Sequence, residues 1–114
     1  MNVREIQEKF NLELAAGEKG LDREVSGAYC GDLLSDVMAN SAKGDIWLTI
    51  QSHQNIMAIA VLKELAAVVL VNGHLPEDDT KTRADEEKIP ILLSGSTAYY
   101  LAGELYKAGI INKV

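Results

Sequence analysis

Three short polar clusters hold the side chains that could bind a ligand: Gln51 to Asn55, Asn72-Gly73-His74 and Ser94-Gly95-Ser96. Asparagine and glutamine amides both donate and accept hydrogen bonds, which suits base edges and hydroxyl groups. A Ser-Gly-Ser sequence that opens a helix suits an anion, because unpaired backbone N–H groups point outward there. We therefore predict a binding site made of Gln51, Ser52, His53, Gln54, Asn55, Asn72, Gly73, His74, Ser94 and Ser96.

The two histidines could transfer a proton or bind a metal. His53 and His74 are 21 residues apart, each after a predicted strand, so they could meet at one rim. His53 also lies near a helix N-terminus, where the dipole disfavours the imidazolium. Because neither has a third ligand or a carboxylate beside it, simple hydrogen-bonding or surface roles are favoured over metal binding or acid–base catalysis.

Motifs of familiar catalysis are missing from the sequence. The lysine–glycine pairs, Lys19-Gly20 and Lys43-Gly44, do not form a phosphate-binding loop. There is no Gly-x-Ser-x-Gly elbow and no His-Glu-x-x-His pair. We therefore expect no catalytic residue, no metal and no cofactor, and we predict that the protein is not an enzyme.

Other charged or reactive residues have structural interpretations. Asp22 and Arg23 could be catalytic, but opposite charges beside a glycine turn favour a solvated loop pair. Acidic residues around Glu77 to Asp79 and Asp85 to Glu87 could bind a metal, but they favour a solvated helix. The single cysteine, Cys30, is predicted to be a reduced, partly buried thiol.

Alternating strands and helices must position these clusters. The most apolar strands are predicted at Ile46–Ile50, Val68–Val71 and Ile91–Leu93, with further strands at Leu12–Leu14 and Val25–Cys30. Helices are predicted at Val3–Phe10, Asp32–Asn40, Gln54 or Asn55 to Leu65, Asp78–Lys88 and from Ser94–Thr97 to Lys107. This pattern predicts one α/β domain over residues 1–114, with a mainly parallel sheet flanked by helices. The polar clusters should then gather at the carboxyl ends of the strands.

The predicted helix from Ile56 to Leu65 is apolar almost all round. One side should face the sheet, and the other could meet a second subunit in a homodimer. Burial beneath the protein's own N-terminal segment explains the pattern equally well.

Three tyrosines, Tyr99, Tyr100 and Tyr106, lie partly off the core stripe of the last helix. For these side chains, packing at an edge is favoured over base stacking or an interface.

The composition limits the classes of partner that we expect the protein to bind. The 114 residues carry a net charge of −6, which disfavours nucleic-acid binding because phosphate contacts need clustered Lys and Arg. The sequence shows neither a basic amphipathic segment nor the apolar core of a signal peptide, so we expect a cytoplasmic protein that does not bind membranes.

The chain resembles DRTGG domains and the related N-terminal domain of HPr kinase/phosphorylase in four segments. These are the run from Val3 to Gly27, the strand at Ile46, the Val71-Asn72-Gly73 turn and Ile89-Pro90-Ile91-Leu92. The resemblance covers nearly the whole chain and implies a mainly parallel α/β domain, often dimeric, without the P-loop domain of the kinase. Such domains are regulatory modules beside CBS domains in some pyrophosphatases, or attached to cobyrinate-synthase-like or phosphotransacetylase proteins.

The chain departs from the family at its name-giving residues. The positions that correspond to the Asp-Arg pair and to Thr-Gly-Gly are His53-Gln54 and Val71-Asn72-Gly73, so only the last glycine is kept. The departure removes an arginine that could have bound a phosphate.

Two classes of function follow. The first is a non-catalytic regulatory module that binds a small, nucleotide-like ligand at the polar clusters, as a homodimer. The second is an interaction or scaffold subunit that docks a partner enzyme without a small-molecule ligand.

Overall fold

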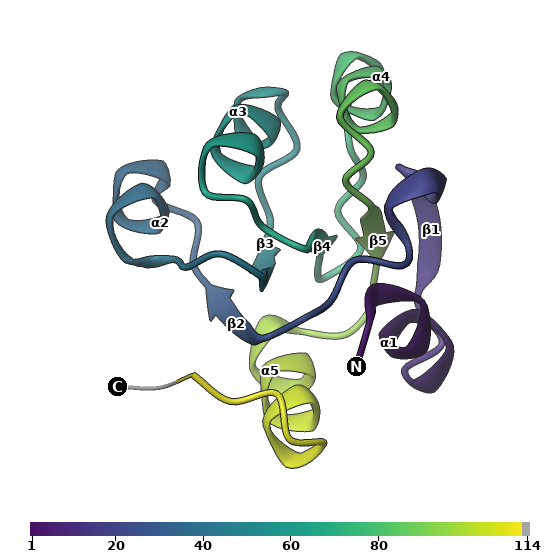
Figure 1. Ribbon diagram of the computed structural model, residues 1–114, viewed down its shortest axis with the longest axis vertical. Helices are drawn as coiled ribbons and strands as arrows, with labels where there is room; N and C mark the ends of the chain where they lie inside the picture. The colour runs from purple at the N-terminus through teal and green to yellow at the C-terminus, as the bar shows by residue number, and fades with distance from the viewer. Residues whose placement is uncertain (113–114) are drawn as a thin grey trace.

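The computed structural model describes residues 1–112 and places a sheet between two layers of helices (Figure 1). The strands are β1 (Glu13–Ala16), β2 (Gly27–Cys30), β3 (Asp45–Thr49), β4 (Ala67–Leu70) and β5 (Ile91–Leu93). The helices are α1 (Val3–Lys9), α2 (Leu34–Asn40), α3 (Asn55–Leu62), α4 (Asp78–Glu87) and α5 (Ala98–Lys107), with a 3₁₀ turn at Glu18–Gly20. The α/β fold with a mainly parallel sheet is confirmed.

The sheet has the order β1-β5-β4-β3-β2. Strands β2 to β5 are parallel, and β3, β4 and β5 each lie beside the strand that precedes them in the chain. A helix connects each pair of parallel strands, as parallel pairing requires. β1 is the exception: it is antiparallel to β5, with Glu13 opposite Leu93.

Alternate strand residues face two separate cores. On β3, Ile46 and Leu48 join the core beneath α1 and α5, whereas Trp47 joins the core beneath α2, α3 and α4. All five β3 residues are buried, so the sheet is covered on both faces at its centre. This explains why its central strands are continuous apolar runs.

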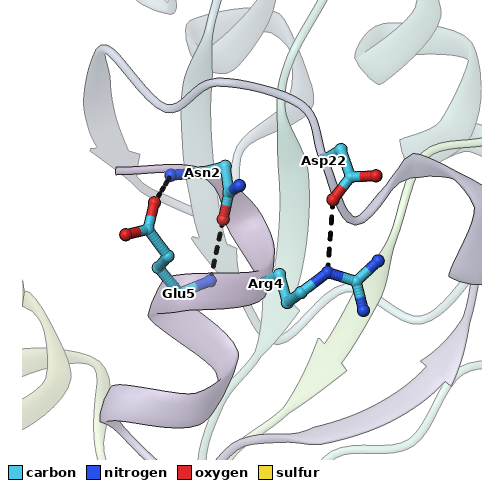
Figure 2. Close-up of polar contacts among 4 residues, drawn as sticks. All are labelled: Asn2, Arg4, Glu5 and Asp22. Atoms are coloured by element: carbon cyan, nitrogen blue, oxygen red, sulfur yellow. Dashed lines mark hydrogen bonds and ion pairs between the residues drawn. The ribbon is translucent and has the colours of Figure 1, made fainter.

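The N-terminal segment is fixed by local polar contacts (Figure 2). The Asn2 side chain accepts a hydrogen bond from the Glu5 N–H, and the Glu5 carboxylate accepts one from the Asn2 N–H, both at 2.9 Å. This reciprocal capping box stabilises the start of α1. Next to it, the Arg4 Nε atom donates to the exposed Asp22 carboxylate at 3.2 Å.

α3 lies between α2 and α4 on one face of the sheet, while α1 lies with α5 on the opposite face (Figure 1). The alternative that the N-terminal segment covers α3 is therefore wrong. The helix ends at Leu62, before the predicted Leu65, because Glu64 takes a left-handed conformation with φ 53°. Val61 and Leu62 remain exposed, by 36% and 68%.

The longest helices, α4 and α5, have 10 residues each. Within residues 1–112, no helix has the length and apolar character needed to cross a membrane.

Candidate functional site

The loops that follow the parallel strands lie together at one edge of the sheet, and hydrogen bonds connect them. The Ser52 carbonyl, after β3, accepts from the Glu77 N–H (3.2 Å) and the Thr80 hydroxyl (2.7 Å) at the start of α4. After β4, the Asn72 N–H donates to the Ser96 carbonyl at 2.7 Å, and the Gly73 N–H donates to the Ser94 carbonyl at 3.1 Å. The three predicted clusters are thus brought to one rim.

The backbone donors of this rim are largely used within the fold. In addition to Asn72 and Gly73, the His74 N–H donates to the Val71 carbonyl at 3.2 Å and closes a turn. Asn72 (φ 56°) and Gly73 (φ 75°) are both left-handed, the geometry of a type I′ turn. A ligand would therefore meet side chains here, more than backbone N–H groups.

The predicted side chains differ in how they present themselves. His53, Gln54, Asn55, Asn72 and His74 are exposed, Gln51, Ser52 and Ser96 are half-buried, and Ser94 is buried. His53 caps α3, since its Nδ1 atom accepts from the Asn55 N–H at 3.1 Å. In the neutral ring the Nε2 atom then carries the proton and can donate outward.

Asp32, which sequence reasoning missed, fixes the β3 end of the rim. Its Oδ1 atom accepts from the Thr49 hydroxyl at 2.8 Å and from the Ile50 N–H at 2.9 Å. The Gln51 amide donates to the Asp32 carbonyl at 2.9 Å, which orients that predicted side chain. The position of Asp32 after the β2 strand was the available signal.

One end of the rim opens into a cavity of about 400 Å³. Ser94 and Ser96 line it from the predicted site, together with Lys9, Asn11 and Tyr100. The residues of Gln51–Asn55 and Asn72–His74 do not line this cavity. Lys9 and Asn11 reach it because β1 pairs with β5, which brings the end of α1 to the rim.

Charge is unevenly distributed along the rim. Glu77, Asp78 and Asp79 lie where α4 begins, and the nearby Lys81 ammonium pairs with Asp78 at 3.5 Å. At the opposite end, Lys9 places a cation beside the Ser94–Ser96 loop, and the Glu104 carboxylate lines the same cavity. The Lys9 end thus has one carboxylate for one lysine, whereas the α4 end has three carboxylates near one lysine, so an anionic group is better accommodated at the Lys9 end.

The remaining candidates take structural roles. Asp22 pairs with Arg4 in solvent, and the Arg23 Nε atom donates to the Lys88 carbonyl at 2.8 Å. Cys30 is exposed, not partly buried as predicted; partial desolvation of the sulfur and then the charge of Asp32 raise the pKa of the thiol. Among residues 1–112, no three His, Cys, Asp or Glu side chains gather in a way that could hold a metal ion.

Comparison with known proteins places this fold. No family model and no curated protein matches the chain. A solved structure that does match contains the CBS and DRTGG domains of the regulatory region of a Clostridium perfringens pyrophosphatase, complexed with its activator diadenosine tetraphosphate. The TM-score is 0.65 at 12% sequence identity, over 91% of this chain and 45% of that chain.

At this identity the match shows a common fold, so the chain has a DRTGG-like α/β fold. It spans less than half of the solved regulatory region. That structural neighbour is a regulatory, not a catalytic, part of its protein.

Proposed function

We propose that this protein is a non-catalytic regulatory module that binds a small, nucleotide-like ligand at the carboxyl ends of its parallel strands. The observation that carries the proposal is the hydrogen-bonded assembly of the three polar loops at one rim. Residues 1–114 are taken as one DRTGG-like domain. The nucleotide bound by the structural neighbour supports the class of ligand.

The rim has two chemically different parts, and each suits a different part of a nucleotide. Exposed amide and imidazole groups of Asn72, His53 and His74 suit a base or a ribose hydroxyl. The cavity with Ser94, Ser96 and Lys9 suits a phosphate. With a single lysine and the Glu104 carboxylate in the cavity, and acidic residues at the far end, we expect one phosphate to be preferred over a polyphosphate chain.

A thermal-shift titration with adenosine, AMP, ATP and diadenosine tetraphosphate tests the proposal. A ligand at one hundred times its Kd adds about 2.7 kcal/mol of stability, which gives a clear rise in Tm. Asn72→Gly keeps the left-handed backbone but removes the amide, and His53→Ala removes the ring; both should abolish the rise. Glu86→Ala, at an exposed position on α4, should keep it.

A rise in Tm that survives both Asn72→Gly and His53→Ala would remove this site from consideration. The same holds if no member of the nucleotide set changes the Tm.

A second candidate function, docking of a partner enzyme, is favoured by apolar residues on the rim itself. Leu33, Ile50 and Leu75 follow β2, β3 and β4, and all three are exposed. Under this alternative, Leu75→Glu should abolish capture of one reproducible enzyme from lysate, and nucleotides should leave the Tm unchanged. Capture that is equal for the native chain and Leu75→Glu would contradict it.

A further inference from the structure

The outward face of α5 is the most exposed aromatic surface among the described residues. Tyr99, Tyr100 and Tyr106 are 92%, 58% and 67% exposed, although packing at an edge was predicted for them. Leu101 and Leu105, on the opposite side of the helix, are buried in the core. A groove of about 540 Å³ lies along the outward face, lined by Tyr99, Tyr100, Ala102, Gly103, Glu104 and Lys107.

We propose that this α5 face binds the same face of a second copy of the chain, with the two helices antiparallel and a two-fold axis at Gly103. This proposal does not rest on the proposed ligand site. It replaces α3 as the dimer contact, since α3 leaves only Val61 and Leu62 as exposed large apolar side chains.

The centre of the face allows close approach. A Cβ atom placed on Gly103 would meet nothing within 4 Å, so the backbone is open to a partner there. Ala102 beside it adds only a methyl group. Small residues at a helix crossing let two backbones pack closely, and at a two-fold axis Gly103 faces its own copy.

The residues on either side of Gly103 complement each other in pairs. Tyr99 and Tyr106 lie on one flank of the helix, and Tyr100 and Lys107 lie on the other, at three or four residues from Gly103. With a rise of 1.5 Å per residue, both members of each pair are about 5–6 Å from the axis, in opposite directions. Antiparallel pairing therefore places Tyr99 against the second copy's Tyr106, and Tyr100 against the second copy's Lys107.

Charge complementarity favours a second copy over an unrelated partner. A hydrogen bond from the Tyr100 hydroxyl to the Glu104 carboxylate raises the pKa of Tyr100. The second copy's Lys107 would approach both this ring and this carboxylate, as a cation–π contact and an ion pair. Each face carries one Glu104 and one Lys107, so two copies meet without net repulsion although the chain has a charge of −6.

The exposed area around α5 can also be compared with the area that a stable dimer interface needs. A stable interface needs roughly 800 Å² from each partner, and a buried tyrosine supplies roughly 150–250 Å². Because these side chains are already partly buried, only their exposed fractions count, and the three tyrosines would provide about half of that area. The exposed Ile111 and a second apolar cavity of about 460 Å³, between Tyr106, Cys30 and Ile110, extend the surface towards β2.

Sedimentation equilibrium gives the first test. The native chain should reach twice its 12.4 kDa mass with rising concentration. Tyr106→Glu should weaken association at least tenfold, and Leu62→Glu on α3 should leave it unchanged. Circular dichroism on both variants checks that they are folded.

Disulfide trapping gives the second test. In a Cys30→Ser background, Gly103→Cys should cross-link two copies under mild oxidation, because a residue at the two-fold axis meets itself within the roughly 7 Å between Cα atoms that a disulfide spans. Leu62→Cys should not cross-link. A monomer at all concentrations, a cross-link through Leu62→Cys alone, or association insensitive to Tyr106→Glu would overturn the proposal; so would a different protein that binds this face while the chain stays monomeric.

Discussion

Two glycines with the same backbone conformation meet different surroundings. Gly17 and Gly73 have φ angles of 77° and 75°, a region that side chains disfavour. A Cβ atom on Gly17 would lie 2.2 Å from the Ile89 carbonyl oxygen, whereas one on Gly73 would meet nothing within 4 Å. The N-terminal segment therefore packs backbone to backbone against the loop before β5.

This difference predicts unequal costs for the same substitution. Gly73→Ala should lower the free energy of unfolding by about 1 kcal/mol, from backbone strain alone. Gly17→Ala adds a clash with a backbone atom that cannot move aside, so it should cost at least about 3 kcal/mol. Urea unfolding of the two variants measures both values, and equal costs would contradict the close approach at Gly17.

Asp45 makes stability depend on pH. Burial raises its pKa, although the Ala42 N–H bond at 2.8 Å and the charge of Lys63 act in the opposite direction. The folded state thus keeps a proton that the unfolded state releases. The contribution of Asp45 to stability should be fully present below about pH 4 and should be lost as the pH rises through the raised pKa.

Asp45→Asn isolates this effect, since asparagine keeps an oxygen for the Ala42 N–H but does not titrate. The free energy of unfolding of the native chain minus that of Asp45→Asn should fall from pH 4 towards neutral pH. A difference that rises over this range would show that the sign is wrong.

At the scale of elements, Asp32 joins the end of β2 to the end of β3. Its carboxylate accepts a hydrogen bond from the hydroxyl of Thr49, which is a buried residue. Asp32→Ala should leave this hydroxyl and the Ile50 N–H without their partner and cost about 2–3 kcal/mol. Asp32→Asn keeps an acceptor oxygen and should cost less than about 1 kcal/mol.

Hydrogen exchange of the Ile50 amide provides the local measurement. It should accelerate in Asp32→Ala and stay close to native in Asp32→Asn. Unchanged protection in Asp32→Ala would mean that another group holds the end of β3.

The sequence predicts the elements well because each central strand is a continuous apolar run followed by polar residues. Ile91–Leu93 was predicted with its observed bounds, and α5 ends at the predicted Lys107. α3 shows the limit of pattern reasoning. A helix covered by α2 and α4 from the same chain has the same apolar pattern as one covered by another subunit.

The candidate site was predictable only in its local parts. Polar residues after Thr49, Leu70 and Leu93 could be assigned to one edge, because parallel strands end together. Lys9 and Asn11 could not be assigned to that edge, since their approach to Ser94 depends on the pairing of Glu13 with Leu93, far along the chain. No periodicity encodes which edge strand an N-terminal segment joins.

At the scale of the whole molecule, the ligand proposal and the dimer proposal meet at Tyr100. Its side chain lines both the α5 groove and the cavity that contains Lys9, Ser94 and Ser96. In the proposed dimer the second copy's Lys107 approaches Tyr100 and offsets the charge of Glu104, which lines the same cavity. Binding of an anionic ligand and association of two chains should then favour each other.

We expect AMP to tighten the dimer by about fivefold, a coupling of about 1 kcal/mol. By reciprocity, AMP should bind the dimer tighter than the monomer by the same factor. Sedimentation equilibrium with and without AMP measures the coupling, and Lys107→Gln should remove it. If AMP leaves the dimer dissociation constant of the native chain unchanged, ligand binding and dimerisation are not coupled.

The antiparallel pairing of β1 with β5 also bears on how the chain is made. Glu13 leaves the ribosome long before its partner Leu93 is translated. Until then β1 has no neighbouring strand, and its own backbone donors and acceptors are open to solvent or to chaperones. The sheet can therefore be completed only after residues 91–93 have left the ribosome.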